Sequence, residues 1–310
     1  MPSEMIRARK SQLTFYRDVE LYKKNIGEGF VLYKPTGMTL QDMRIQEEMH
    51  PSVLYIKQRD KTQGIQEAQK GFNKILKADV KSGNSEKVRE TVVTIVEETL
   101  TEPRAGSLEG VSETVGILVS DYSKNPDVLK QLIDLSRTDF STVLHSINVM
   151  AFALGFAFFL NYSQDEAKLL GLSALLHDVG KTKINTDILT APRRLTDEEF
   201  EEMKSHTTIG YNILRNCKFN NEDISITALE HHEKLDGSGY PNNKTKINQT
   251  AQIIGIIDCY EVLTNDDRPY RKSMGVFNTL KQIIGKDVQS GKFSKDLYSK
   301  LVLSLAGMQK

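Results

Sequence analysis

The chain has 310 residues and only six histidines, and five of these lie between residues 145 and 232. The five are His145, His177, His206, His231 and His232, and the last two are adjacent in the stretch HHEKLDGSGYP. Imidazole nitrogens that lie beside carboxylates are common metal ligands. A single histidine on an apolar helix is more often a core residue, so it is the group of five that favours a metal site.

Two aspartates lie in apolar surroundings, where burying an unpaired carboxylate is costly. Asp178 follows His177 at the end of the apolar stretch LLGLSALL, and Asp258 lies within AQIIGIIDCY. Neighbouring residues of a helix point about 100° apart, so His177 can bind one metal while Asp178 bridges to a second. A cation would also offset the burial of Asp258, for which the alternative is a salt bridge to Lys181 or Arg268.

Four motifs occur in the order and approximate spacing of the HD-GYP domain, a subgroup of the HD phosphohydrolase superfamily. They are LLHDVGK, MKSHTTIG, HHEKLDGSGYP and IIDCYEVLTNDDRPYR. The resemblance covers about residues 139–271. It implies an all-helical HD-type bundle that hydrolyses cyclic di-GMP to linear pGpG, and on to GMP, with a bridging hydroxide on a two-metal centre.

The resemblance also implies which residues carry this chemistry. The metal ligands would be His145, His177, Asp178, His206, His231, His232 and Asp258, and they would hold two divalent ions, iron or alternatively manganese. The catalytic residues would be Asp178, Lys181 and Asp139. The substrate, cyclic di-GMP or a related dinucleotide, would contact Lys181, Arg268, Arg271, Gly239 and Tyr240. Glu233 would orient an imidazole rather than bind a metal.

Three departures from the family pattern concern turnover. Ser141 stands where the family has a tyrosine, or a glutamate in members with a third metal, and a serine is a poor metal ligand. Glu261 replaces a usual aspartate, and TNDDRPY has one residue more than the family's TSDRPY, before Arg268. We therefore expect two metals and weak activity.

Two other hypotheses remain open at this stage. In the first, a weakly active or inactive metal-bound domain senses a cyclic dinucleotide or binds a protein partner, such as a diguanylate cyclase domain, through the loop of residues 237–241. In the second, the chain is a structural helical bundle with incidental histidines.

The elements that must position these residues are mainly helices. The helical patterns cover residues 65–78, 86–100, 108–123, 126–136, 142–160, 164–176, 197–216, 223–232, 250–263, 276–285 and 294–306. Short β-branched and aromatic runs predict strands at residues 18–22, 30–34 and 53–56, with a short helix at 40–49. The fold class is therefore mainly α. Residues 1–82 form a small α/β accessory, regulatory domain, and residues 83–310 form a helical HD-GYP domain with linker helices at its start.

Composition narrows the class of protein further. Lysine plus arginine equals aspartate plus glutamate, 41 to 41, so the net charge gives no sign of a DNA partner. Cys217 and Cys259 make no disulfide framework, and the first residues lack the apolar core of a signal peptide. The longest apolar run, Val149 to Leu160, is shorter than the ~20 residues that span a bilayer, which predicts a buried helix. We expect a cytoplasmic bacterial signalling protein without a membrane span.

Overall fold

The computed structural model describes residues 4–25, 27, 29–43, 45, 49–101, 103, 107–122, 142–217, 219, 221–264 and 275–308. The contacts between residues divide the chain into two compact units, Met1–Ala78 and Asp79–Lys310. The long helix α1 (Lys61–Ser82) runs through the point where the first unit ends, and Gly83, with a φ of +67°, follows it.

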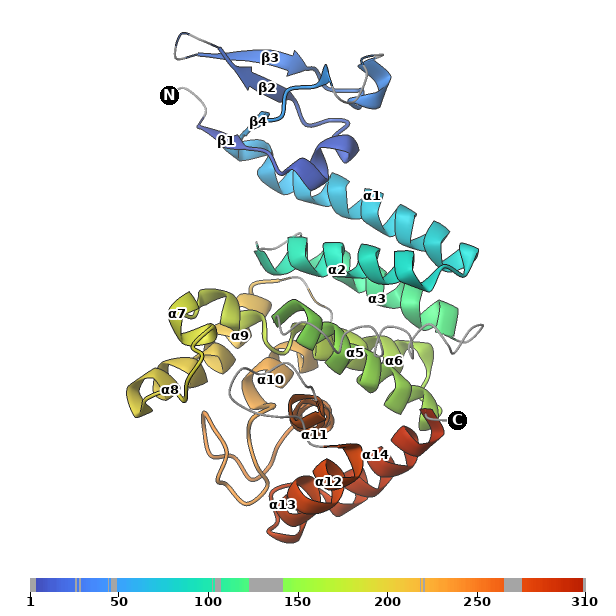
Figure 1. Ribbon diagram of the computed structural model, residues 1–310, viewed down its shortest axis with the longest axis vertical. Coiled ribbons are helices and arrows are strands. Elements are labelled where there is room, and N and C mark those ends of the chain that lie inside the picture. Colours follow the sequence, from blue (N-terminus) through green and yellow to red (C-terminus); the bar gives the residue numbers. More distant parts are fainter. Residues whose placement is uncertain are drawn as a thin grey trace. The chain divides into compact units, whose positions relative to one another are not determined.

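The first unit contains one antiparallel sheet of four short strands in the order β1-β4-β2-β3 (Figure 1). The strands are β1 (Met5–Arg7), β2 (Leu21–Lys24), β3 (Phe30–Lys34) and β4 (Tyr55–Lys57). β2 and β3 form a hairpin, whereas β4 lies between β1 and β2, with Ile6 opposite Ile56. The sheet therefore pairs segments from both ends of the unit.

The sequence pattern predicts three of these four strands. β3 has the predicted bounds, while β2 and β4 begin later than predicted. β1 is not predicted, because three residues are too few to show a period of two. In the region of the helix predicted at 40–49, the described residues include the 3-10 turn Gln41–Met43 and no α-helix.

Helix α1 covers the core of the first unit with one apolar face. Its residues Ala68, Phe72 and Leu76 are buried, at the three- and four-residue spacing that lines one side of a helix. The ring of Phe72 packs edge-on against Phe15, with 4.7 Å between the ring centroids. This aromatic pair joins α1 to the segment between β1 and β2.

Within the described residues, the second unit contains helices and loops and no strand. Its α-helices are α2 (Ser85–Thr101), α3 (Ser107–Tyr122), α5 (Thr142–Phe159), α6 (Gln164–Leu176), α7 (Thr186–Leu189), α8 (Asp197–Lys204), α9 (His206–Arg215), α10 (Asp223–Glu230), α11 (Gln249–Thr264), α12 (Val276–Asn278), α13 (Gly285–Gln289) and α14 (Lys295–Met308). A 3-10 helix, Val179–Lys183, follows α6, and a π-helical stretch, Thr279–Ile284, joins α12 to α13.

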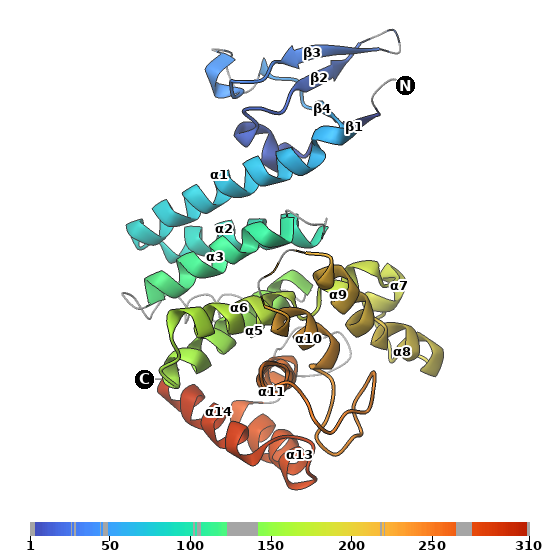
Figure 2. The same cartoon turned by 180° about the vertical axis from the view of Figure 1, so that it is seen from behind.

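Helices α5, α6 and α11 form the centre of this unit. α5 packs along α6, and α11 lies against α5 and α10, with α14 beside α5 and α11. Both views show α11 close to end-on among these helices (Figures 1 and 2). Almost every residue of α5 from Leu144 to Ala157 is buried, which agrees with the apolar run in its sequence.

Helix α5 also has the length and hydropathy of a membrane-spanning helix, and it is the one described helix that does. However, 72% of its 18 residues are buried within the protein. A core helix of this kind passes the same test on length and composition, so the finding is weak evidence for a span.

Two predicted helices are divided in the structure. The segment 197–216 breaks at Ser205, whose hydroxyl donates to the backbone carbonyl of Glu202 at 2.6 Å and ends α8. A serine hydroxyl that bonds the preceding turn competes with the helical ladder, and this local bond has no strong signature in the sequence. The segment 276–285 contains the π-helical turn instead of one regular helix. The helix predicted at 126–136 lies outside the described residues.

Candidate metal centre

The seven predicted metal ligands come from five elements of the second unit and meet at one place. His145 lies on α5, His177 and Asp178 follow α6, His206 begins α9, His231 and His232 follow α10, and Asp258 lies on α11. Two overlapping groups have ligand atoms within 4.8 Å of one another: Asp178 with His206, His231 and His232, and Asp178 with His145 and His177. Asp178 belongs to both groups.

The two carboxylate oxygens of Asp178 face different pairs of imidazoles. Oδ1 lies 3.3 Å from Nε2 of His206 and 3.7 Å from Nε2 of His231. Oδ2 lies 3.4 Å from Nε2 of both His145 and His177. The bridging position predicted for Asp178 is therefore available in the structure, with one oxygen for each half of the site.

Backbone carbonyls orient three of the imidazoles. Nδ1 of His177 lies 2.6 Å from the carbonyl oxygen of Ala174, and Nδ1 of His206 lies 2.6 Å from that of Met203. Nδ1 of His231 lies 3.0 Å from the carbonyl oxygen of Ala228. A carbonyl can only accept, so each Nδ1 carries the proton and each Nε2 presents a lone pair.

In this arrangement, hydrogen-bond acceptor atoms of three side chains face one another. Nε2 of His206 lies 3.4 Å from Nε2 of His231, and both face Oδ1 of Asp178, which is buried with no hydrogen-bond donor among the described residues. Three lone pairs around one point repel each other unless a cation lies between them. The donor set therefore fits a divalent metal ion.

Asp258 extends the half of the site that contains His145. Its Oδ1 lies 3.2 Å from Nε2 of His145, and its Oδ2 lies 4.0 Å from Nδ1 of His232. Of the salt-bridge partners considered from the sequence, Lys181 pairs with Asp178 instead, and Arg268 lies outside the described residues. Within the described residues, Asp258 thus faces imidazoles, as a metal ligand would.

Burial and neighbouring charges shift the pKa values of these groups strongly. Burial lowers the pKa of His206 to about 4 and holds the pKa of His231 well below its usual value. Burial alone would raise the pKa of Asp178, but Lys181 and the imidazoles hold it well below its usual range. His145 is an exception, because burial would lower its pKa but the carboxylates of Glu261, Asp178 and Asp258 raise it. The other imidazoles are neutral around an ionised carboxylate, and these are the protonation states that bind metal.

Glycine at position 180 allows the two parts of the site to approach. A Cβ on Gly180 would lie 1.9 Å from the carbonyl oxygen of His206, a distance that no side chain can occupy. The 3-10 helix after Asp178 therefore lies directly against the first turn of α9. This contact brings His206 next to Asp178.

Lys181 lies one turn after Asp178 and its ammonium forms an ion pair with Oδ2 of that carboxylate. The ammonium is part-buried at the edge of the site. To contact a phosphate, the ammonium of Lys181 must break its ion pair with Asp178 or share its protons between the two groups. The phosphate contact of Lys181 stays a prediction.

Two buried glutamates have roles that the sequence did not indicate. Glu261, on α11, places Oε2 at 2.7 Å from Nδ1 of His145 and accepts from Asn148 through Oε1 at 2.8 Å. The prediction that Glu233 orients an imidazole is wrong, because its carboxylate accepts the backbone N–H groups of Asn242 and Lys244, at 2.7 and 2.9 Å. The one signal for Glu261 was its spacing of three residues from Asp258, which puts both on one face of α11.

Glu233 fixes the base of the loop of residues 237–241, which forms a wall of a cavity. Gly239 is buried, and a Cβ there would lie 2.4 Å from the Cα of Glu233, so this glycine serves close packing. The ring of Tyr240 packs on the ring of His232, with 4.7 Å between centroids. Tyr240 thus joins the loop to the metal centre, and its predicted substrate contact stays a prediction.

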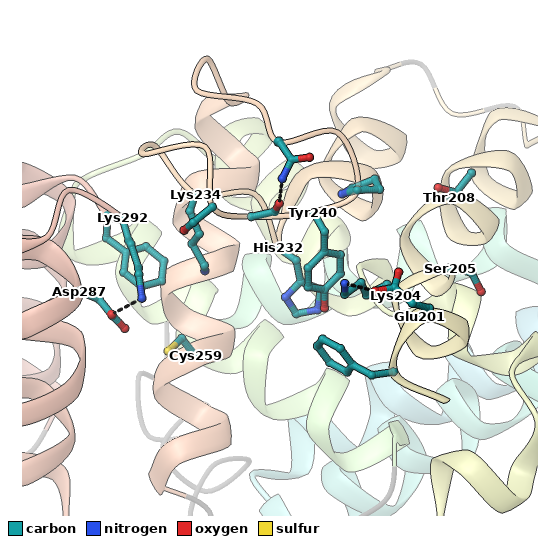
Figure 3. Close-up of a pocket in the computed structure, with 16 residues that line it drawn as sticks. Glu201, Lys204, Ser205, Thr208, His232, Lys234, Tyr240, Cys259, Asp287 and Lys292 are labelled. Atoms are coloured by element: carbon teal, nitrogen blue, oxygen red, sulfur yellow. Dashed lines mark hydrogen bonds and ion pairs between the residues drawn. The ribbon is translucent and has the colours of Figure 1, made fainter. Parts of the chain in front are cut away.

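The cavity beside His232 has a volume of about 730 Å³, within the range of pockets that hold small ligands (Figure 3). Its walls come from α8, the loop of residues 238–243, α11 and the segment of residues 287–293. Both predicted contacts in the loop, Gly239 and Tyr240, line it. The remaining predicted residues Asp139, Arg268 and Arg271, and the departure Ser141, lie outside the described residues.

Sequence comparisons relate residues 127–292 to a known protein family. The family profile described as "HD domain" matches residues 127–292. The chain is similar to the cyclic di-GMP phosphodiesterase PA4108 of Pseudomonas aeruginosa, with 30% identity over 56% of this chain and 42% of that protein. It is also similar to the 3′3′-cGAMP-specific phosphodiesterase 1 of Vibrio cholerae, with 32% identity over 52% of this chain and 37% of that protein.

One solved structure resembles the chain over nearly its whole length. It is described as Bd1817, a HDG"Y"P protein from Bdellovibrio bacteriovorus, and it superposes with a TM-score of 0.63 at 17% identity, covering 96% of this chain and 98% of that one. This likeness supports the fold. The chain spans less than half the length of the two curated relatives.

Proposed function

The chain belongs to the HD domain family, and on this premise we propose that it is a metal-dependent phosphodiesterase that hydrolyses cyclic di-GMP to linear pGpG and on to GMP. The observation that carries the proposal is the buried set of imidazole nitrogens that face Asp178, whose Oδ1 has no donor among the described residues while its Oδ2 pairs with Lys181. The similarity to phosphodiesterases that act on cyclic dinucleotides supports the choice of substrate.

The residues present fit two divalent cations, for which iron is proposed and manganese is the alternative. One cation would be held by His206, His231, His232 and Asp178, and the other by His145, His177, Asp178 and Asp258. When bound, such cations lower the pKa of water and neutralise charge on phosphoryl oxygens. A mixed set of imidazole and carboxylate donors suits iron, manganese and zinc alike, so ligand chemistry alone does not select among them.

The chain's own residues position the reaction. Glu261, which accepts from Asn148, orients His145, and three backbone carbonyls orient His177, His206 and His231 with their Nε2 lone pairs toward Asp178. Lys181 lies beside Asp178, where its ammonium can bind a phosphate oxygen as the substrate enters. Opening the cyclic dinucleotide breaks a P–O3′ bond, and the leaving oxygen needs a proton, which we assign to Asp139 or Lys181.

A second function is a cyclic dinucleotide sensor with little turnover. Two observations favour it: Ser141 replaces the family's tyrosine, and Lys181 is already engaged by Asp178. In that case the loop of residues 237–241 would bind a protein partner, such as a diguanylate cyclase domain. In either case we propose that the first unit is a regulatory accessory domain and that the protein acts in cytoplasmic signalling.

Turnover of cyclic di-GMP by protein of defined metal content tests the proposal. Protein purified without oxygen and loaded with iron or manganese should form pGpG, and the Asp258→Asn variant should form much less. Cyclic di-GMP binding without product would support the sensor. Loaded protein that neither binds nor hydrolyses cyclic di-GMP, 3′3′-cGAMP or cyclic di-AMP would contradict both functions.

A further inference from the structure

The cavity beside the metal centre carries positive charge on three lysines, which lie on separate elements. Lys204 comes from α8, Lys234 from the segment after α10, and Lys292 from the segment after α13. The two acids in the lining, Glu201 and Asp287, are each taken up by one of these lysines. Lys204 pairs with Glu201 at 2.6 Å, and Lys292 pairs with Asp287 at 2.9 Å.

Lys234 is the lysine of this cavity that has no such partner within the described residues. Its ammonium lies 4.0 Å from the ring centroid of Phe293, and no carboxylate of the described part of the chain forms an ion pair with it. Figure 3 shows its side chain pointing into the cavity, between Lys292 and His232 in that view. Lys234 is therefore a part-buried cation with an aromatic contact and no direct ion pair to a carboxylate of the described residues.

A cation that has lost part of its hydration is costly unless an anion compensates it. Of the proposed metal ligands, His232 lines this cavity, so the metal centre would border it and bind one phosphate of a substrate there. A cyclic dinucleotide carries two phosphates in one ring, so its second phosphate must lie away from the metals. The aromatic rings of Phe200, Tyr240 and Phe293 line the same cavity, where nucleobases can stack on them.

The geometry points to Lys234 as the anchor for the phosphate that is not cleaved. This inference rests on the proposed function, because it assumes a substrate with two phosphates. It adds a residue to the expected substrate contacts, of which Arg268 and Arg271 lie outside the described residues. Lys234 would act on affinity for the dinucleotide and not on the chemical step.

The test compares Lys234→Met, which keeps the length of the side chain and removes its charge, with Lys246→Met as the matched control. Lys246 is exposed, lies twelve residues further along the same loop region and does not line the cavity. With equal metal content, Lys234→Met should raise the dissociation constant of cyclic di-GMP about 10- to 100-fold. This is the loss of affinity expected for a charge-assisted bond to phosphate. Lys246→Met should bind as wild type does.

A substrate with one phosphate separates this role from a general one. Hydrolysis of bis(p-nitrophenyl) phosphate should have the same kcat/KM in wild type and Lys234→Met, because this diester has no second phosphate to anchor. An equal loss on both substrates would overturn the inference and place Lys234 at the scissile group. Unchanged binding of cyclic di-GMP by Lys234→Met would also overturn it.

Because the main readout is binding, failure of the two proposals can be told apart. If wild type binds cyclic di-GMP without cleaving it, the proposed activity fails, while the comparison of dissociation constants still decides the role of Lys234.

Alkylation gives a second measure of occupancy, since Cys259 lines the cavity and Cys217 does not. Cyclic di-GMP should slow alkylation of Cys259 alone in wild type, and at the same concentration it should protect Lys234→Met much less; equal protection would contradict the inference.

Discussion

Oε2 of Glu261 lies 2.7 Å from Nδ1 of His145, and both side chains are buried. The other carboxylate oxygen accepts from the amide of Asn148, so two residues of α5 hold one carboxylate of α11. This contact turns Nε2 of His145 toward Asp178 and Asp258. The packing of α5 on α11 therefore orients one of the predicted metal ligands.

Replacing this carboxylate should weaken metal binding without unfolding the protein. Glu261→Gln keeps the shape of the side chain but leaves His145 with a neutral acceptor, which lowers the basicity of its imidazole. Loss of such a partner typically costs 10- to 100-fold in metal affinity. Chelator competition on the loaded protein should measure this loss for the metal that His145 binds.

Glu233→Gln provides the control, because Glu233 is equally a buried carboxylate but contacts backbone N–H groups of the loop and no imidazole. Its metal affinity should match wild type. Equal metal affinity in Glu261→Gln and wild type would show that His145 does not depend on this carboxylate.

Asp178 should be required for both metals. Its two oxygens face two separate pairs of imidazoles, so Asp178→Ala removes an anionic ligand from each half of the site. Elemental analysis should find two metals per chain in fully loaded wild type and almost none in the variant. One metal or three metals per chain in wild type would contradict the two-cation assignment.

Lys181 should affect the substrate more than the metals. Lys181→Ala removes the ion pair with Asp178 but none of the proposed ligands, so metal content should stay at the wild-type value while turnover of cyclic di-GMP falls. Lys183→Ala is the matched control, since Lys183 is exposed on the same 3-10 helix. Loss of metal from Lys181→Ala, with unchanged turnover per loaded site, would make its role structural.

The sequence motifs indicated the proposed ligands more readily than the residues that hold them. The ligand set followed from the resemblance to the HD-GYP motifs, and the structure brings six of its members into two overlapping groups, with Asp258 beside His145. That these residues bind metal stays a prediction. The role of Glu261 depends on how α5 packs on α11, and residues 145 and 261 are too far apart in the chain for a local pattern to connect them. Glu233 was misassigned for a related reason, since its partners belong to a loop that folds back on it.

The metal-free protein should lose stability as the pH falls from about 6.5 to about 4. Burial lowers the pKa of His206 to about 4, whereas in the unfolded chain a histidine has a pKa of about 6.5. The unfolded chain therefore takes up a proton first, and stability that is present above pH 6.5 is lost down to pH 4, by about 3 kcal/mol from His206 alone. The pKa values of His177, His231 and His232 are also lowered, whereas that of His145 is raised and opposes the trend.

Urea unfolding with chelator present, at pH 7 and at pH 5, checks this expectation. His206→Gln removes the titrating group, so its stability should change less between the two pH values. A metal-free protein as stable at pH 5 as at pH 7 would mean that these imidazoles are not buried in the neutral form.

Position 141 should set the rate of the proposed reaction. Ser141 lies outside the described residues, and it has a short hydroxyl where the family it resembles has a tyrosine. We therefore expect the attacking water to be held less firmly in position. Poor positioning alone can cost ~100-fold in rate. We therefore expect slow hydrolysis of cyclic di-GMP by wild type and faster hydrolysis by Ser141→Tyr at the same metal content, measured as pGpG formed per loaded site.

Ser141→Ala is the control, because it also lacks the phenol and should stay slow. Rapid hydrolysis by wild type, with the tyrosine variant no faster, would show that another step limits turnover.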